Sequence, residues 1–532
     1  MKIEDISHYF NLGKITSQLL YSRGLTSFNA IDKFLNPSLD NLQDPARIPN
    51  IESIKGIIEQ HIDWNNKILI YGDYDVDGTG GATILYKALK MMGAENLRGM
   101  ISNRFKDGYG LSQRIVDYTL EHNISLLITV DCGISDWQYI KQLKDKGVDV
   151  IVIDHHEGKP INTEYIDLKV ESGDLEFTEY CGAGIAWMAS RYFTNSDLYD
   201  LLDLVAFATI ADVVPLVKDN RAITAKGIEK MKRNPMEPIR QLIEIQDIKL
   251  SDITSGKVGY QVAPLINAQG RLADNQKAFD YLTGQLSKIT DKTNPKYEDI
   301  AEEFREINER RKEISDRCLK NAKKKVKPSD NIVVVQEEIP AGVVGLVAGD
   351  IKEELNKPVV VIGQPNGEGL CKGSCRSVYP LSIVEALDNA SEYLETFGGH
   401  DMASGLSIKE SNIEGFKSCL LEYVDGIEYS STKYDMELST SKIDTRLIND
   451  LDVFKPTGRS NPSPKFLFEG NVSKKLIGKD YNHIKGKIND VEFIGFGMGS
   501  KIGSLNSSMI GSLSINKWRG RSKPQIYLKE IL

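Results

Sequence analysis

The chain has 532 residues, of which 41% are hydrophobic and 27% charged, and its net charge is −9. This composition is typical of a soluble globular protein, and the length favours about three domains over a single core. The longest apolar stretch, residues 201–217, contains Asp203 and Asp212, which argues against a membrane span. The first residues lack the basic and apolar regions of a signal peptide, so we expect a cytoplasmic protein.

Charge is distributed unevenly along the chain. Residues 456–532 contain thirteen Lys or Arg and five Asp or Glu and carry +8, whereas the remainder carries −17. A basic segment on an acidic body suits a protein that binds phosphates in one place and cations in another. The six cysteines form no CxxC pair, which favours free thiols over a structural zinc site.

Residues 1–65 are predicted to form a polar, helical segment without recognisable chemistry. Beyond it, apolar runs alternate with helical stretches, the first of which is predicted over Ala82–Met92. This alternation predicts a parallel sheet in an α/β domain, in which functional residues gather where the strands end. Three of the runs end in acidic or imidazole side chains: residues 67–78, Leu126–Gly133 and Val148–His156.

The second half of the chain shows three further patterns. Residues 297–319 carry apolar side chains at helical spacing and predict one long helix that joins two lobes. Residues 331–363 repeat the strand, glycine turn, helix and strand order of an α/β unit, which continues to about Lys409. After about Tyr434, short alternating strands with Gly, Asn and Ser turns predict a small β-barrel.

Asp73, Asp75 and Asp77 precede Gly78 at a predicted strand-to-helix turn. Carboxylates two residues apart on an extended segment point the same way, and three together repel one another unless a cation neutralises them. A calcium-binding EF-hand loop is excluded because Ile84 occupies its twelfth position, where glutamate is needed, and because a strand precedes it.

Other carboxylates and imidazoles end separate apolar runs, namely Asp131, the Asp154–His155–His156 run, and Asp212. Each alone is explained by helix capping or by ordinary burial of a histidine. Together they favour a metal site, because so many capping groups do not otherwise collect at strand ends. Oxygen ligands with one imidazole suit Mn²⁺ or Mg²⁺, and two such ions about 4 Å apart would hold a phosphoryl group, with one carboxylate bridging them.

Several motifs follow one another along the chain: GDYDVDGTG, NRFKDGYGLS, TVDCG, IDHH, CGAG, ADVVPL, INAQGRL, GSCRS, FGGHDMASGL, GRSNPSPKF and INKWRGR. Their order resembles the DHH phosphoesterases, and specifically the RecJ exonucleases. The resemblance runs from about residue 65 to the end of the chain. It implies a metal-dependent hydrolase that cleaves single-stranded DNA from 5′ to 3′ into mononucleotides, in DNA repair or recombination.

The resemblance also implies a domain plan and a division of roles. The expected plan is an N-terminal helical segment (1–65), a DHH lobe with a parallel sheet (66–285), a connecting helix (286–328), an α/β DHH-associated lobe (329–430) and an OB-fold barrel (431–532). The implied metal ligands are Asp75, Asp77, Asp131, His155 and Asp212. Asp131 would bridge the two ions, with His156 and His400 as catalytic imidazoles. The implied pocket for a 5′ phosphate consists of Arg104, Arg271, Ser374 and Arg376.

The predicted barrel mixes basic and aromatic side chains, a combination that suits single-stranded DNA. Trp518 beside Arg519 is the expected stacking site, whereas Phe466 and Phe468 are expected in the barrel core. The expected partners are single-stranded DNA and a single-strand-binding protein or helicase. The protein is expected to act as a monomer away from membranes.

Two positions depart from the family pattern. Leu265 replaces an arginine of the usual APRxNAAGR motif, and Pro340 stands where a histidine is common. Both changes put DNA contacts of the second lobe in question, and neither touches the metal residues. Two other functions remain open: a DHH phosphodiesterase acting on short oligonucleotides or cyclic dinucleotides, and an inactive DNA-binding scaffold.

Overall fold

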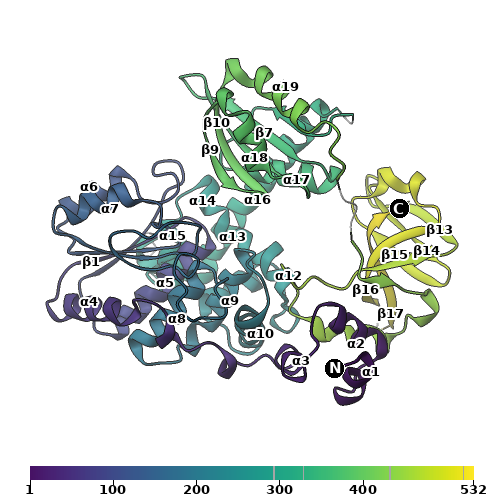
Figure 1. Cartoon of the computed structure of the whole chain (residues 1–532), viewed down its shortest axis with the longest axis horizontal. Helices are drawn as coiled ribbons and strands as arrows, with labels where there is room; N and C mark the ends of the chain where they lie inside the picture. The colour runs from purple at the N-terminus through teal and green to yellow at the C-terminus, as the bar shows by residue number, and fades with distance from the viewer. Residues whose placement is uncertain (291–293, 328, 430–432, 519–520) are drawn as a thin grey trace.

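Three β-sheets, each with its own hydrophobic core, divide the protein into three lobes (Figure 1). The computed structural model describes residues 1–290, 294–327, 329–429, 433–518 and 521–532; the side chains of residues 517, 518 and 521 are not described. Within these residues, no helix is both long enough and apolar enough to span a membrane.

The first lobe contains a five-stranded parallel sheet in the order β2-β1-β3-β4-β5. Its two central strands are buried along their whole length, as expected where helices cover both faces of a parallel sheet. The strands are β1 (Ile68–Gly72), β2 (Leu97–Ile101), β3 (Leu126–Val130), β4 (Asp149–Ile153) and β5 (Glu164–Ile166).

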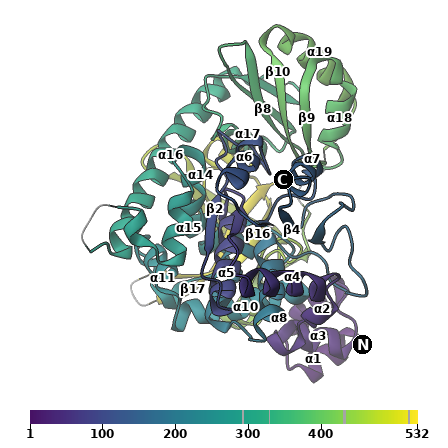
Figure 2. The ribbon, with the colours of Figure 1, turned by 90° about the vertical axis from the view of Figure 1, so that its left-hand side faces the viewer.

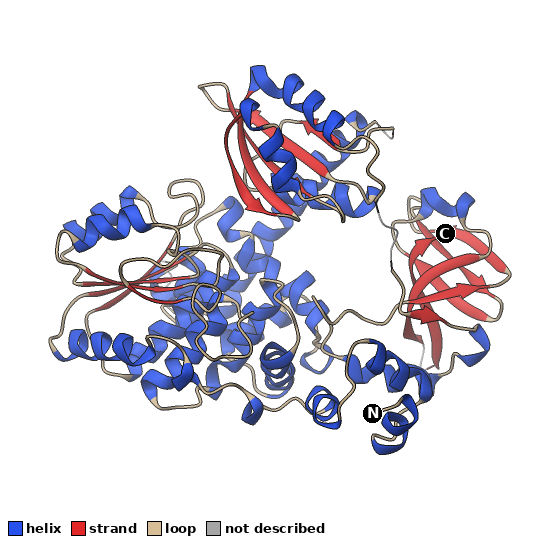
Figure 3. Cartoon of the chain, viewed as in Figure 1, coloured by secondary structure: helices blue, strands red, loops and turns tan. Residues whose placement is uncertain are grey.

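Helices cover this sheet and continue beyond it as a helical subdomain (Figure 3). They include a continuous run from α12 through the π-helical segment η5 (Val258–Val262) to α14. The helices are α4 (Ile51–Asp63), α5 (Val76–Met91), α6 (Gln113–Glu121), α7 (Trp137–Lys144), α8 (Gly182–Thr194), α9 (Leu202–Ala211), α10 (Lys218–Arg233), α11 (Glu237–Glu244), α12 (Ser255–Lys257), α13 (Ala263–Asn267), α14 (Gln269–Leu272) and α15 (Gln276–Thr283).

A single helix, α16 (Tyr297–Lys325), joins the first lobe to the second (Figure 2). Its first turns bury Ile300 and Phe304 in the core of the first lobe, and its last turns bury Cys318 and Ala322 against the second. The helix is longer than the predicted 297–319 because its last turn carries three lysines, which favour the negative end of the helix dipole.

The second lobe is a five-stranded sheet in the order β6-β7-β8-β10-β9, parallel only between β6 and β7. Two helices, α18 and α19, pack on one face, and α16 and α17 pack on the other. Its elements are β6 (Val333–Gln336), α17 (Val344–Leu355), β7 (Val359–Pro365), β8 (Leu370–Arg376), α18 (Ile383–Asn389), β9 (Leu394–His400), β10 (Ala403–Lys409) and α19 (Ile413–Tyr423).

The third lobe is a mixed seven-stranded sheet in the order β11-β12-β16-β17-β15-β14-β13. Phe466 and Phe468 are fully buried in its core, as predicted. Its elements are β11 (Met436–Glu437), α20 (Thr445–Asp450), β12 (Phe466–Glu469), β13 (Val472–Ile477), β14 (His483–Ile488), β15 (Val491–Gly495), β16 (Ser508–Trp518) and β17 (Arg521–Ile531).

The N-terminal segment does not form a unit of its own. Its first three helices, α1 (Ile3–Tyr9), α2 (Lys14–Ser22) and α3 (Phe28–Leu35), bury Ile6, Leu20 and Ile31 in the core of the third lobe. Helix α4 instead buries Ile54 and Ile58 in the first lobe. The two ends of the chain therefore share one core, although they are more than 400 residues apart in sequence.

A guanidinium group ties the third lobe to the first. Arg221 of α10 is 3% exposed, and its nitrogens donate to five backbone carbonyls, those of Phe34, Val453, Phe454, Lys455 and Pro456, at 2.8–3.3 Å. Burial lowers its pKa to about 10. Because the acceptors belong to the connection into the barrel and to α3, this contact fixes the third lobe against the first.

Candidate active site

The predicted acidic residues meet at the carboxyl edge of the first sheet. Asp73 directly follows β1, Asp131 follows β3, and Asp154 follows β4, while Asp212 caps the C-terminal end of α9. Because β1, β3 and β4 are adjacent and parallel, the ends of these three strands lie side by side.

Helix α5 begins earlier than the predicted Ala82. The Asp75 carboxylate accepts hydrogen bonds from the N–H groups of Asp77 (2.8 Å) and Gly78 (3.2 Å), so it acts as the N-cap and the helix starts at Val76. Asp77 consequently lies in the first helical turn, not on an extended segment. Its two oxygens accept from the N–H groups of Gly182 (2.6 Å) and Ala183 (2.8 Å) at the start of α8.

Asp131 is held in an unusual backbone conformation. Its φ of 62° is left-handed, a region that aspartate tolerates better than most side chains. The start of α8 packs directly against it, because a Cβ at Gly182 would lie 2.7 Å from the Asp131 Cβ. A glycine at position 182 is therefore required for this approach, which gives the CGAG motif a physical role.

His155 stands at the centre of the acidic group. Its Nε2 is 3.1 Å from Asp131 Oδ1, 3.6 Å from Asp77 Oδ2 and 3.8 Å from Asp212 Oδ2. Two overlapping sets of ligand atoms surround it, each within 4.8 Å of one another: Asp77–His155–Asp212 and Asp131–His155–His156. A third set, Asp73–Asp75–Asp131, shares Asp131 with the second.

The electrostatics of this group are unfavourable without a cation. Burial raises the pKa of Asp131 and Asp212 well above the usual carboxyl range, and the charges of Asp77 and Asp75 raise both further. Burial, followed by the charge of Asp75, raises the pKa of Asp73 to about 8. Burial also lowers the pKa of His155, so its imidazole is neutral and available as a ligand.

The donor set fits divalent cations. Asp131 Oδ1 and both ring nitrogens of His155 are buried, and none of these three atoms has a hydrogen-bond partner among the described residues. Buried polar atoms are rarely left unpaired, so atoms of this kind facing one another indicate a ligand. Carboxylates with one imidazole suit Mn²⁺ or Mg²⁺, and more than one such set of ligand atoms leaves room for two ions.

His156 is oriented by two neighbours. Its Nδ1 lies 2.8 Å from Asp154 Oδ1 and 2.8 Å from the Tyr109 hydroxyl, which itself donates to the Asp131 carbonyl at 3.2 Å. Burial lowers the pKa of His156, but the hydrogen bond to Asp154 and the negative charges of Asp154, Asp77 and Asp73 together outweigh burial and raise the pKa overall. Tyr109 was not identified from the sequence.

A cavity of 880 Å³ between the first and second lobes adjoins the metal residues. It reaches them through Tyr74, which lies between Asp73 and Asp75, and through Tyr109. All four residues expected to bind a 5′ phosphate line this cavity: Arg104, Arg271, Ser374 and Arg376.

The arginines of the cavity are held by neutral groups, so their charge is not cancelled there. Arg376 donates to Ser374 Oγ (3.0 Å) and to the Cys375 carbonyl (2.7 Å), and Arg271 donates to the Gly342 carbonyl (2.9 Å). The Arg104 guanidinium lies 4.2 Å over the Tyr74 ring, and its buried Nε has no hydrogen-bond partner among the described residues. Burial, with the charge of Arg104, lowers the pKa of Arg271 to about 10.

His400 lies at the edge of this cavity. It follows two lining glycines, of which Gly399 has a φ of 148° and would place a Cβ 2.4 Å from the Ala403 carbonyl oxygen. Burial lowers the pKa of His400, and the charges of Arg459 and Arg376 lower it further. Within the described chain, His400 makes no hydrogen bond or ion pair with the predicted metal ligands.

The departures from the family pattern fall in different places. Leu265 is fully buried in the core of the first lobe. This change therefore concerns packing, whereas the sequence predicted an effect on DNA contacts of the second lobe. Pro340 is exposed in the turn before α17, between two residues that line the cavity, Ile339 and Ala341.

In the third lobe, Arg519 and the Trp518 side chain lie outside the described residues. Other aromatic side chains gather there: the Phe496 ring lies 5.7 Å from Tyr527 and 5.1 Å from His483, and Lys529 lies 4.3 Å over Tyr527. On β13 and β14, Lys475 faces Lys485 across the strands, with Lys487 two pairs further along. Lys485 pairs with Glu492 at 3.8 Å, whereas Lys475 and Lys487 make no ion pair with the described residues.

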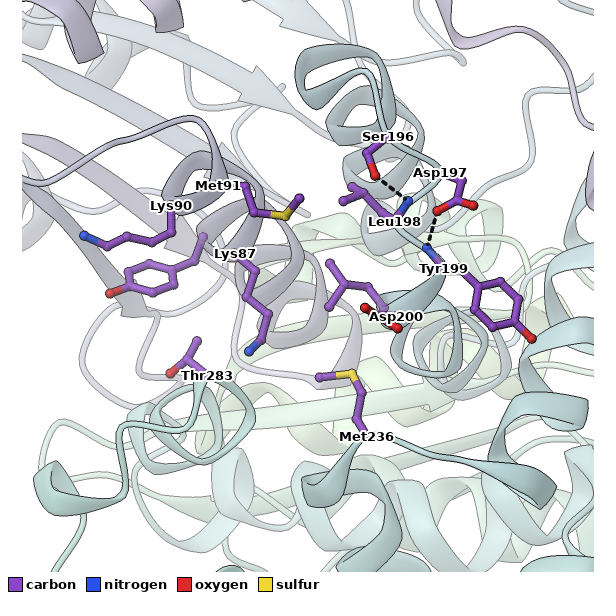
Figure 4. A pocket seen from close by; sticks show the side chains of 12 residues that line it. Lys87, Lys90, Met91, Ser196, Asp197, Leu198, Tyr199, Asp200, Met236 and Thr283 are labelled. Carbon is purple, nitrogen blue, oxygen red and sulfur yellow. Dashed lines mark hydrogen bonds between the residues drawn. The ribbon is translucent and has the colours of Figure 1, made fainter.

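A second cavity, of 680 Å³, lies at the opposite end of α5 from Asp77 (Figure 4). It is lined by Lys87, Met91, Leu198 and Met236 among others, and burial lowers the pKa of Lys87. Tyr86, the first residue of α5 that lines this cavity, follows Asp77 by nine residues, which corresponds to about 14 Å of helix. It is not part of the candidate active site.

Comparison with protein families identifies three consecutive parts of the chain. Residues 67–209 match the DHH family N-terminal domain, residues 329–426 the DHHA1 domain, and residues 434–530 the RecJ OB domain. The chain therefore contains a DHH domain, a DHHA1 domain and a RecJ OB domain in this order, and it is similar to the RecJ exonucleases.

Relatives across the RecJ family match the chain along nearly its whole length. The single-stranded-DNA-specific exonuclease RecJ of Bacillus subtilis is 29% identical over 99% of this chain and 69% of that protein. RecJ of Thermus thermophilus in complex with Mn²⁺ has a TM-score of 0.84 at 26% identity, covering 99% of this chain and 77% of that one. Its complex with Mg²⁺ matches with a TM-score of 0.79 at 24% identity over 99% and 76% of the two chains.

Proposed function

We propose that this protein is an exodeoxyribonuclease that hydrolyses single-stranded DNA from the 5′ end, with two Mn²⁺ or Mg²⁺ ions, and releases mononucleotides. The single observation that carries the proposal is the junction of two sites. A carboxylate and imidazole centre suited to divalent cations adjoins a cavity lined by three arginines that no carboxylate neutralises in the described chain.

The proposed metal ligands are Asp75, Asp77, Asp131, His155 and Asp212. Asp73 is added to them because its carboxylate lies close to those of Asp75 and Asp131. When bound, the ions would polarise the scissile phosphate and lower the pKa of a water molecule. The Asp77 carboxylate is held by two N–H groups at the start of α8, so its position is fixed before any ligand binds.

His156 and His400 are proposed to act on the phosphate itself. His156 holds a proton on Nδ1 toward Asp154, and its raised pKa lets Nε2 donate a hydrogen bond to a phosphate oxygen. His400 approaches from the second lobe. The cations near it favour its neutral form, which can accept a proton.

Arg104, Arg271, Ser374 and Arg376 are proposed to bind the terminal 5′ phosphate. Arginine forks form paired hydrogen bonds with phosphate oxygens, and a closed pocket for the chain end would set the cleavage position one nucleotide away. The expected selectivity for single strands follows from the burial of the metal residues, because a duplex is too wide to place its backbone there.

The decisive experiment incubates the protein with Mn²⁺ or Mg²⁺ and four substrates: 5′-phosphorylated single-stranded DNA, the same strand with a 5′ hydroxyl, duplex DNA and RNA. Mononucleotides released from the 5′ end of single-stranded DNA would support the proposal. Activity confined to dinucleotides or cyclic dinucleotides would favour a phosphodiesterase of short substrates. Binding of the strand without hydrolysis under either metal would favour an inactive scaffold.

Roles in DNA repair or recombination accord with this activity. We also propose that the protein works as a monomer in the cytoplasm, where its six free thiols would stay reduced, and that a single-strand-binding protein or helicase supplies its substrate. Sedimentation of the purified protein alone and with each partner tests these assignments.

A further inference from the structure

One helical run passes beside the metal centre from the phosphate cavity toward the third lobe. It comprises residues 255–272, from α12 to α14. Near its middle, Asn267 Oδ1 accepts a hydrogen bond from the Val76 N–H at 3.1 Å, directly after Asp75. Arg271 lies at one end, in the phosphate cavity, and Ser255 at the other donates to the Thr457 carbonyl at 2.8 Å. The run therefore spans the distance from the cavity to the barrel connection.

Tyr260 projects from this run into solvent. Its side chain is 87% exposed, although it lies in the π-helical segment η5 and not at a loop tip. Such π segments are rare and often occur at functional sites. Tyr260 precedes Arg271 by eleven residues, which corresponds to about 16 Å of helix.

Tyr260 belongs to the side of the metal centre that carries Asp212. The adjacent Gly259 packs on the end of α9, since its Cβ would lie 3.4 Å from Ile210 Cγ2. Val213, directly after Asp212, is 58% exposed and has a φ of 59°. A left-handed conformation is strained for a β-branched residue, and strain of this kind clusters at functional sites.

A cation stands on the same side. The carbonyl of Arg459 accepts a hydrogen bond from the Leu216 N–H at 2.9 Å, four residues after Asp212. Its exposed side chain makes no hydrogen bond or ion pair with the part of the chain that is described. A Cβ at the preceding Gly458 would lie 2.6 Å from Leu216 Cδ1, so the segment that carries Arg459 packs directly on the chain that follows Asp212.

We infer that Tyr260 and Arg459 hold the DNA strand on the 3′ side of the scissile phosphate. The inference rests on the proposed function and adds a binding subsite to it. The 5′ nucleotide occupies the cavity at the Arg271 end of the run, and the strand then crosses the metal centre toward Asp212. There, the Tyr260 ring stacks on a base while Arg459 pairs with the phosphate beside it, before the strand reaches the barrel.

The test uses Tyr260→Ala, Tyr260→Phe and Arg459→Ala in the full-length protein. Trp64→Ala is the matched control, because Trp64 is 65% exposed but follows α4 on the first lobe, remote from this run. Steady-state hydrolysis of a 5′-phosphorylated strand of about 20 nucleotides, long enough to reach from the cavity to the barrel, is measured with Mn²⁺. Binding of the same strand, labelled at its 3′ end, is measured by fluorescence anisotropy in EDTA.

Tyr260→Ala should raise KM and Kd about tenfold, the size of one lost base–aromatic stack, with kcat nearly unchanged. Tyr260→Phe should restore both values, since it keeps the ring. Arg459→Ala should weaken binding and flatten its salt dependence by about 0.7 in log–log slope.

The two hypotheses fail in different ways. An active wild-type protein whose KM and Kd are unchanged by Tyr260→Ala and by Arg459→Ala would overturn this inference and leave the proposed function intact. A wild-type protein that hydrolyses no single strand, but whose Kd rises tenfold in Tyr260→Ala, would overturn the proposed function and keep the strand contact.

Discussion

The metal centre and the phosphate cavity adjoin one another, yet they are built in different ways. Asp77 and Asp131 are 1% and 3% exposed, and backbone groups of a single lobe position both. Arg104 and Arg376 are partly exposed and come from two lobes that α16 joins. The first site is complete within one core, whereas the second exists only while two lobes keep their arrangement. Changes to the two sites should therefore have separable effects.

The largest effect is expected from Asp131→Asn. This change keeps the shape and tolerates the left-handed backbone, but it removes a charge that two of the three ligand sets share. Hydrolysis should fall at least about 10³-fold, the size of several kcal/mol of lost metal assistance. The melting temperature without metal should not fall, because the substitution relieves repulsion between buried carboxylates. A lower melting temperature together with full activity would contradict the scheme.

A smaller effect is expected from Arg376→Ala, which acts on the cavity alone. Loss of a charge-assisted phosphate contact should reduce kcat/KM about 10- to 100-fold for strands with a 5′ phosphate. Strands with a 5′ hydroxyl should be cleaved as slowly by the variant as by the wild-type protein. Stabilisation by Mn²⁺, followed by thermal unfolding, should be unchanged, and its loss would show that the two sites are not separable.

Tyr109→Phe tests the boundary between the two sites. It keeps the ring in the cavity but removes the hydroxyl that bonds to His156 Nδ1 and to the Asp131 carbonyl. Loss of a group that orients a metal ligand typically lowers activity by at least one order of magnitude. We therefore expect kcat to drop about tenfold with little change in KM. A change in KM alone would assign Tyr109 to DNA binding and not to the positioning of His156.

The smallest effect is expected in the third lobe. Replacing Lys475 and Lys487 with glutamine removes two exposed cations that make no ion pair in the described chain. Cleavage of long strands should slow about threefold at moderate salt, and the salt slope of binding should fall by about 1.4, or 0.7 for each lost phosphate contact. Cleavage of a short strand that cannot reach the barrel should not change.

The meeting of acidic residues at one edge of the first sheet could be predicted, because some of them directly follow strands, whereas their role as metal ligands stays a prediction. Asp131 and Asp154 each end a buried parallel strand, and parallel strands end at one edge. The cavity residues were expected only through the family resemblance, since nothing local distinguishes Arg104 from a surface arginine. Tyr109, Tyr260 and Arg459 were missed, because their importance depends on which distant elements pack beside them.

Two errors had a physical cause that the sequence hides. The sequence predicts that α5 begins at Ala82, because it presents the preceding aspartates as ligand candidates and does not show that Asp75 is also a helix cap. It predicts one segment over the first 65 residues because these residues are uniformly helical and polar. Amphipathic helices do not reveal which core they cover, and here α1–α3 and α4 cover different ones.

The contact of Arg221 with five carbonyls has a practical consequence for anyone who trims this protein. Since α1–α3 complete the core of the barrel, removing the first 35 residues would damage the C-terminal module. Removing the barrel would in turn expose the apolar faces of three helices. It would also remove most of the carbonyl groups that accept hydrogen bonds from Arg221. Truncation at either terminus therefore disturbs the structure of both ends of the chain, and point substitutions are the sounder tool.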